Sequence, residues 1–200
     1  MFPKTVGFES IFEKARHKSM LTEDRLNALY NVGSYCSNLD GDFAELGCHC
    51  GGTSFLLASL LKPDHRLYSF DSFEGLPEPT IYDNPTGNPK GRLKADYETV
   101  RNYLSCYGEK VMVYKGWVED TLVNIKDKPL SLIYIDMDVY NPTIFSIKYL
   151  WNQLVKGGYM IFDDYLWEAT PAIKKAVDEF FPNIFRHNHY FVHPQLGIQK

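Results

Sequence analysis

The chain has 200 residues, 44% of them apolar and 15% aromatic, which is enough to form one well-buried core. Its formal net charge is -4 and it has no run of basic residues, so we expect no nucleic-acid partner. No stretch reaches the ~18 continuous apolar residues of a membrane helix, and the N-terminus lacks a signal-peptide pattern. We therefore predict one domain over residues 1–200, a cytoplasmic location, no membrane association and a small-molecule partner.

Two helical segments precede the first predicted strand. Residues 9–17 show an amphipathic pattern, and Thr22 is placed to cap a helix that runs to about Cys36 with an apolar stripe. We expect these N-terminal helices, within residues 1–40, to cover the site. Their aromatic residues are compatible with a homodimer.

From residue 42 onward, short β-branched or apolar runs alternate with helical patterns. The predicted strands are residues 42–46, 66–70, 111–115, 130–136 and 158–163, and the helices that follow them are residues 53–61, 93–108, 119–125, 142–154 and 171–181. Such alternation requires crossover connections, so we predict an α/β fold with a mostly parallel sheet and helices on both faces. Beyond Pro182 we predict a terminal hairpin that joins the sheet.

Proline and glycine residues mark several predicted boundaries. Asn141-Pro142 and Thr170-Pro171 are typical of helix starts, and Gly157-Gly158 is typical of a helix end. The connection over residues 72–92 is rich in proline and glycine and longer than the ~12 to 15 residues usual for ordered loops. We interpret it as a substrate lid, the alternative being a loop without function.

Ligands of open parallel sheets bind beyond the carboxyl ends of the strands. After the first strand, Gly47 allows a tight turn, and the helix that opens at Thr53 presents free N–H groups to an anionic ligand group. After the second strand, Asp71 stands where an acidic side chain commonly binds ribose hydroxyls, although it could be an ordinary turn residue. After the third, Trp117 could stack on adenine or simply anchor a helix in the core. The predicted cofactor-binding residues are Glu45, Gly47, Gly51, Thr53, Asp71, Ser72, Gly116, Trp117 and Asp136.

Aspartates follow the fourth and fifth predicted strands. Asp136 ends the fourth strand, and Asp163 and Asp164 end the fifth. If these strands are neighbours, about 4.8 Å apart, the three carboxylates converge and require a cation. Because hard oxygen ligands suit Mg2+, which keeps open positions for substrate oxygens, we predict a Mg2+ site there. The alternative is that these aspartates only cap and turn the chain.

These motifs, taken in order, carry a family resemblance. ELGxxxGG, FDSFEGLPEP, KGWxxDTL, DMDVYNPT and GGYMIFDDY resemble the TylF-type (macrocin O-methyltransferase) family, from about Met20 to the C-terminus. The resemblance implies a Rossmann-like class I methyltransferase fold with a seven-stranded sheet, S-adenosylmethionine as cofactor and Mg2+ held by Asp136, Asp163 and Asp164. It also implies that Asp138 is the general base.

The chain departs from this pattern at two points. Only some 40 residues precede the first strand, so any longer N-terminal element of relatives is short here. The catalytic lysine of catechol-type enzymes would fall on Val139, which leaves Asp138 as the predicted catalytic residue.

We therefore predict an O-methyltransferase, dependent on S-adenosylmethionine and Mg2+, that acts on one hydroxyl of a vicinal diol in a sugar or glycoside. One alternative is a glycosyltransferase that uses Asp136-Met137-Asp138 as its DxD motif. Another is a methyltransferase-like protein that only binds.

Overall fold

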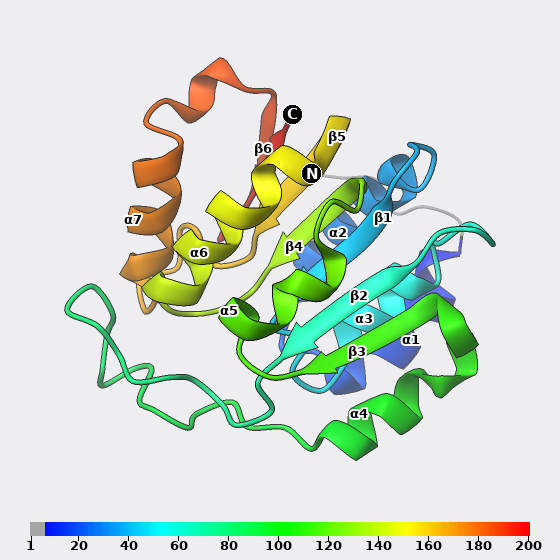
Figure 1. The fold of residues 1–200 in the computed structure, drawn as a ribbon, viewed down its shortest axis with the longest axis horizontal. Helices are drawn as coiled ribbons and strands as arrows, with labels where there is room; N and C mark the ends of the chain where they lie inside the picture. Colours follow the sequence, from blue (N-terminus) through cyan, green and yellow to red (C-terminus); the bar gives the residue numbers. More distant parts are fainter. Residues whose placement is uncertain (1–6) are drawn as a thin grey trace.

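The computed structural model describes residues 7–200, so the first six residues of the expected N-terminal element lie outside it. Seven strands form one sheet in the order β3-β2-β1-β4-β5-β7-β6 (Figure 1). Strands β1 to β5 pair in parallel, whereas β7 is antiparallel to both β5 and β6. The strands are β1 Asp42–Leu46, β2 Leu67–Asp71, β3 Val111–Lys115, β4 Leu130–Ile135, β5 Leu154–Phe162, β6 His189–Val192 and β7 Gln195–Gln199. The predicted mostly parallel sheet and terminal hairpin are confirmed.

Helices cover both faces of the sheet, as predicted. In Figure 1, α5, α6 and α7 lie on one face, α1, α2 and α3 lie on the other, and α4 lies next to β3. The α-helices are α1 Phe8–Ala15, α2 Glu23–Cys36, α3 Gly52–Ala58, α4 Tyr97–Leu104, α5 Val118–Thr121, α6 Tyr140–Leu150 and α7 Pro171–Phe180. Short 3-10 turns cover Arg16–Lys18, Ser105–Lys110, Leu122–Ile125, Trp151–Gln153 and Ile184–Arg186. No helix within residues 7–200 is long and apolar enough to span a membrane.

Alternate residues of the central strands face opposite helical layers. In β1, Phe43 packs in the cluster formed with α1, α2 and α3, whereas Ala44 packs in the cluster formed with α5, α6 and α7. In β4, Leu132 and Ile133 divide in the same way. Both faces of the sheet are therefore buried, which explains why these strands are nearly continuous apolar runs.

Three predicted helix boundaries were wrong. Helix α6 begins at Tyr140 with Val139 at its N-cap, so Pro142 lies inside the first turn, where its missing N–H leaves no hydrogen bond unmade. Gly157 and Gly158 lie within β5, in an irregular stretch where the φ of Gly157 is +87°, and do not end a helix. Helix α4 begins at Tyr97 rather than near Leu93, because the Asp96 side chain accepts the first capping hydrogen bond.

The predicted start of α2 after Thr22 and the start of α7 at Pro171 agree with the structure. The chain places β2 and β3 on one side of β1, and β4 and then β5 on its other side, so the strand order reverses between β1 and β4. The carboxyl ends of these strands are linked by hydrogen bonds from Asp136 N–H to the Leu46 carbonyl oxygen (2.9 Å) and from Asp163 N–H to the Ile135 carbonyl oxygen (3.0 Å). The predicted aspartates therefore meet at the point where such sheets bind ligands.

Candidate active site

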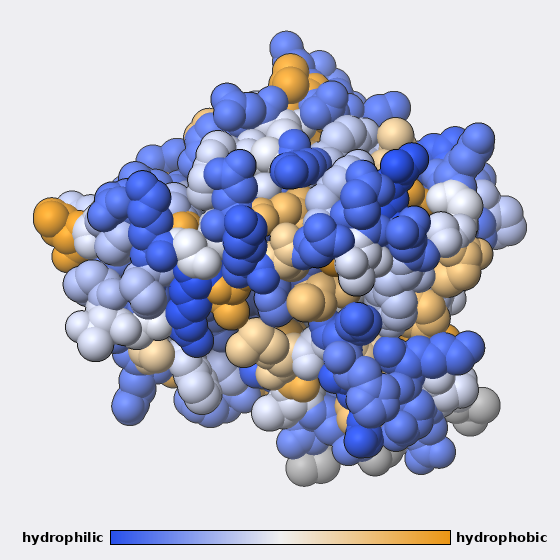
Figure 2. Space-filling model, turned by 90° about the horizontal axis from the view of Figure 1, so that it is seen from below, coloured by the Kyte–Doolittle hydropathy of each residue, from blue (hydrophilic) through white to orange (hydrophobic). Residues whose placement is uncertain are grey.

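A cavity of about 420 Å³ opens at the carboxyl ends of the strands. Figure 2, which views the molecule from below, shows apolar side chains gathered in the middle of this face and hydrophilic side chains around them. The predicted site residues that line the cavity are Gly47, Thr53, Asp71, Ser72, Gly116, Trp117, Asp136, Asp138, Asp163 and Asp164. Its size is typical of a small-molecule site.

The turn after β1 brings the backbone of two strands into close contact. Gly47 has φ +88°, and a Cβ atom there would lie 2.0 Å from the carbonyl oxygen of Asp136. Only glycine fits this position, because any side chain would push the end of β4 away. Gly47 therefore fixes where Asp136 stands. Gly51, also predicted as a cofactor residue, has φ +83° at the N-cap of α3 but does not line the cavity.

Glu45 is fully buried and does not line the cavity. Its carboxylate accepts hydrogen bonds from the hydroxyl groups of Thr53, Ser54 and Ser69, the last at 3.2 Å. Burial raises the pKa of Glu45 to about 7, although these hydroxyl groups oppose the shift. The structure therefore places Glu45 beneath the cavity wall, where it holds the start of α3 and the side chain of Thr53.

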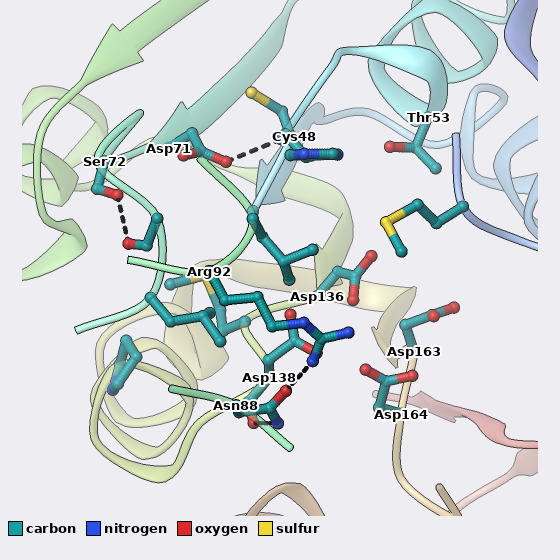
Figure 3. Close-up of a pocket in the computed structure, with 18 of the residues that line it drawn as sticks. Cys48, Thr53, Asp71, Ser72, Asn88, Arg92, Asp136, Asp138, Asp163 and Asp164 are labelled. Carbon is teal, nitrogen blue, oxygen red and sulfur yellow. Dashed lines mark hydrogen bonds between the residues drawn. The ribbon is translucent and has the colours of Figure 1, made fainter. Parts of the chain in front are cut away.

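Asp71 lies on the opposite side of the cavity from the other aspartates (Figure 3). Its two carboxylate oxygens accept hydrogen bonds from the backbone N–H groups of His49 (2.8 Å) and Phe73 (2.7 Å). The carbonyl oxygen of Asp71 accepts from Gly116 N–H at 3.0 Å, which joins the ends of β2 and β3. Trp117, next in the chain, also lines the cavity. Asp71, Gly116 and Trp117 thus form one polar and aromatic wall.

Three carboxylates lie close enough together to share a cation. Oxygen atoms of Asp136, Asp138 and Asp164 all lie within 4.8 Å of one another. Asp138 has φ +61°, an unusual backbone conformation for a residue other than glycine. This conformation follows β4 directly and directs Asp138 into the same space as Asp136 (Figure 3). We call Asp136, Asp138, Asp163 and Asp164 the acid cluster.

The acid cluster carries more negative charge than its surroundings compensate. Burial, and then the charges of Asp163 and Asp138, raise the pKa of Asp164 to about 8. Burial raises the pKa of Asp138 to about 6, although a hydrogen bond with Asp164 lowers it. The pKa of Asp136 is raised well above its ordinary value by burial and by Asp163 and Asp164. Without a cation, Asp164 therefore holds a proton that it donates to Asp138.

Asp163 has two side-chain partners outside the acid cluster, and one of them also reaches Asp164. One of its oxygens accepts from the side-chain amide of Gln195 at 3.1 Å, and the other pairs with Nη1 of Arg25. Nη1 of Arg25 also lies 3.6 Å from Oδ1 of Asp164. Asp163 is therefore the carboxylate of the acid cluster that makes direct contacts with two side chains outside the cluster, those of Arg25 and Gln195.

The predicted lid, residues 72–92, contributes three polar residues to the cavity wall, Ser72, Asn88 and Arg92. The side-chain amide of Asn88 donates to the backbone carbonyl oxygen of Asp138 (3.3 Å), and Arg92 donates to the side-chain oxygen of Asn88. The Arg92 guanidinium extends toward Asp136 and Asp138 (Figure 3). Near the tip of the lid, Asp83 accepts from Tyr140 N–H at 2.8 Å, which fastens the lid to α6.

The sequence-based prediction missed several cavity residues. Arg25, Asn88 and Arg92 line the cavity, as does the connection over residues 18–22. Asn88 and Arg92 lie in a loop that was predicted to matter, but no periodicity singles out a residue there. A signal for Arg25 did exist, since a positive charge in the first turn of a helix opposes the helix dipole and calls for another explanation.

The donor atoms of the acid cluster fit a divalent metal ion. All are carboxylate oxygens, the ligands that Mg2+ prefers, and they are buried or half-buried. A cation would offset the burial that raises their pKa values, and with it the repulsion between the carboxylates. The opposite wall, with Asp71 and Trp117, fits the ribose and base of a nucleoside.

Residues 14–194 match the family model described as Macrocin-O-methyltransferase (TylF). The chain belongs to this family. Demethyldecarbamoylnovobiocin O-methyltransferase of Streptomyces niveus is 30% identical over 158 residues, which cover 72% of this chain and 59% of that protein. Mycinamicin III 3''-O-methyltransferase of Micromonospora griseorubida is 28% identical over 179 residues, which cover 81% of this chain and 69% of that protein. The match to the Streptomyces protein thus covers less than two thirds of that relative.

Solved structures show the same fold. The structure of the O-methyltransferase NovP has a TM-score of 0.81 and 24% identity, with 100% of this chain and 90% of that chain covered. An O-methyltransferase from Bacillus cereus, solved in complex with SAH, has a TM-score of 0.63 and 14% identity, with 100% and 93% covered. The predicted class I methyltransferase fold is therefore confirmed.

Proposed function

We propose that the chain is an O-methyltransferase that uses S-adenosylmethionine and Mg2+ and acts on one hydroxyl of a vicinal diol in a sugar or glycoside. This proposal rests on the observation that Asp71, Trp117 and the acid cluster line one and the same cavity. A wall suited to a nucleoside and a cluster of carboxylates suited to a metal ion face the same space. Methyl transfer requires that donor and acceptor meet in this way, at ~3 to 3.5 Å between the reacting atoms.

The nucleoside wall is proposed to bind S-adenosylmethionine, which supplies the methyl group as an electrophilic sulfonium. Asp71 retains lone pairs for ribose hydroxyls beyond the two backbone hydrogen bonds it accepts. Trp117 is proposed to offer an aromatic face to the adenine, and Gly47 and Thr53 line the same cavity. The negative charge of the cluster favours the cationic donor over its neutral product.

The acid cluster is proposed to hold Mg2+ and to receive the proton. We assign the ion to the ligands predicted from the sequence, Asp136, Asp163 and Asp164. The carboxylate oxygens that lie within 4.8 Å of one another are those of Asp136, Asp138 and Asp164, so Asp138 faces the same space. A bound Mg2+ supplies a Lewis acid that lowers the pKa of a sugar hydroxyl. Asp138 then acts as the general base, since the Asn88 contact to its backbone and its left-handed conformation fix its carboxylate above the cavity.

The acceptor class rests on the relatives and on the lid. By their names, the relatives described above are O-methyltransferases of demethyldecarbamoylnovobiocin and of the 3'' position of mycinamicin III. The lid places Asn88 and Arg92 over the acid cluster, where their N–H groups can bind sugar hydroxyls. We propose that the lid opens to admit the acceptor and closes to exclude water. Family membership favours this function over the glycosyltransferase alternative.

Two matched variants test the assigned roles. Asp138→Asn should bind Mg2+ and S-adenosylhomocysteine with nearly wild-type affinity, but should lose about 10² to 10⁴ in turnover because it cannot accept a proton. Asp136→Ala should lose metal binding while keeping S-adenosylhomocysteine binding. Binding is measured by calorimetry and turnover with labelled S-adenosylmethionine and a panel of glycosides. Unchanged metal affinity in Asp136→Ala, or wild-type turnover in Asp138→Asn, would contradict the assignment.

A further inference from the structure

Arg25 occupies a position that its own helix does not favour. It lies in the first turn of α2, where the helix dipole disfavours a positive charge. Its side chain is only 12% exposed, and its Nε is buried without a hydrogen-bond partner among residues 7–200. An arginine is rarely buried to this extent unless carboxylates compensate its charge. The reason for its position must therefore lie outside the helix.

The acid cluster supplies that reason. Burial lowers the pKa of Arg25, but the charge of Asp163, followed by Tyr134, Asp164 and Asp136, outweighs burial, so the pKa is raised. Nη1 of Arg25 reaches Asp163 directly and Asp164 at 3.6 Å. The guanidinium thus remains charged, and it contacts two of the carboxylates that are proposed to bind a divalent ion, those of Asp163 and Asp164.

Arg25 also connects the acid cluster to the cavity wall. Its Nη2 donates to the carbonyl oxygen of Met20 at 3.4 Å, and Met20 belongs to the connection over residues 18–22 that lines the cavity. On the other side, Gln195 donates to Asp163 and accepts from the hydroxyl of Tyr190 at 3.1 Å. Asp163 is therefore held from both sides while Asp136, Asp138 and Asp164 face one another.

We propose that Arg25 is a positioning residue of the metal site, one that holds the acid cluster together when no ion is bound and weakens the binding of the ion when it enters. This inference rests on the proposed function, because it assumes a divalent ion at the acid cluster. Two cations near the same carboxylates repel each other. Even with the screening of bulk water, a unit charge ~4 Å from a divalent ion weakens binding by at least about tenfold.

The test compares two variants of Arg25 with a surface control. Arg25→Met removes the charge at similar length, and Arg25→Lys keeps it. Arg16→Met is the control, since Arg16 pairs with Glu13 at 3.3 Å on the surface of the same N-terminal segment. The affinity for Mn2+ and Mg2+ is measured by calorimetry without any methyl donor. The melting temperature is measured in EDTA and in saturating Mg2+.

We expect Arg25→Met to bind the ion at least about tenfold more tightly than the wild type. In EDTA it should melt several degrees lower, and Mg2+ should restore most of that loss, because the ion replaces the missing positive charge. Arg25→Lys and Arg16→Met should bind the ion as the wild type does. If Arg25→Met unfolds in EDTA, refolding on addition of Mg2+ supports the proposal.

Other results would overturn it. Weaker ion binding by Arg25→Met, failure to refold with Mg2+, or an equal loss of melting temperature with and without Mg2+ would make Arg25 a purely structural residue. Wild-type protein that binds no divalent ion would instead remove the metal from the proposed function, and this inference with it. Titration of the wild type with Mn2+ and Mg2+ therefore distinguishes failure of the metal assignment from failure of the role given to Arg25.

Discussion

The proton held by Asp164 makes a specific prediction about stability and pH. With its pKa raised to about 8 by burial and by neighbouring carboxylates, Asp164 holds a proton in the folded, metal-free protein at pH 7. In the unfolded chain its pKa returns to ~3.9, so the unfolded state holds no proton there. Because the folded state binds more protons, the free energy of unfolding must fall as pH rises between these two pKa values.

The size of this effect follows from the number of protons. One proton corresponds to ~1.4 kcal/mol per pH unit, so stability should fall by about 2 kcal/mol between pH 5.5 and pH 7.0 through Asp164. Glu45 and Asp138, with pKa values of about 7 and 6, add to the fall in the same direction. A variant is therefore needed to isolate Asp164.

The assay is urea unfolding in EDTA at pH 5.5 and pH 7.0, for the wild type and for Asp164→Asn. The variant presents an amide that donates to Asp138 as the protonated carboxyl does, but does not titrate. We expect the wild type to lose about 2 kcal/mol more than the variant over this interval. Saturating Mg2+ should remove the difference, since the ion stabilises the ionised form. Parallel pH dependences of the two proteins in EDTA would refute the reasoning.

Two further predictions each include a matched control variant. Gly47→Ala should weaken Mg2+ binding at least about tenfold, because the new Cβ would displace Asp136. Gly108→Ala, at φ +58° and ψ -135° with nothing within 4 Å of the new Cβ, should leave Mg2+ binding unchanged and cost only about 1 to 3 kcal/mol of backbone strain. Equal effects of the two on binding would argue against the close contact. Tyr82→Ala removes a ring whose centroid lies 4.7 Å from that of Tyr140 in α6, at an interplanar angle of 55°, so limited proteolysis should cut the lid faster. Ile81→Ala, at a residue that is 90% exposed, should change nothing. Identical digestion of both would show that the lid is not fastened there.

Local signals were sufficient to predict the sheet and the strand ends. The switch from period-2 or continuous apolar runs to helical patterns identified all five parallel strands, and the aspartates after β4 and β5 identified the cavity edge. The contact between Asp163 and Arg25 spans 138 residues of sequence, and no local pattern encodes such a pair. Asp163 and Asp164 are adjacent in the sequence, but their side chains point in different directions. The sequence therefore did not predict that Asp163, and not Asp164, would bind both Arg25 and Gln195.

Glu45 illustrates a different reason for error. A carboxylate at the end of a strand was interpreted as facing the ligand, but the strand is buried on both faces, and Glu45 points inward to three hydroxyl groups. Serine and threonine are common in helices and strands, so nothing in the sequence indicated that the hydroxyl groups of Thr53, Ser54 and Ser69 would bind Glu45. A buried network of this kind becomes visible only once the strand register is known.

The central claim is tested most directly by calorimetric titration of S-adenosylmethionine, and separately of S-adenosylhomocysteine, into the protein with Mg2+ and again with EDTA. The proposed function predicts binding of both ligands at one site per chain, because Asp71 and Trp117 lie outside the acid cluster and do not depend on the ion. Absence of binding of either ligand under both conditions would contradict the assignment of this cavity to methyl transfer.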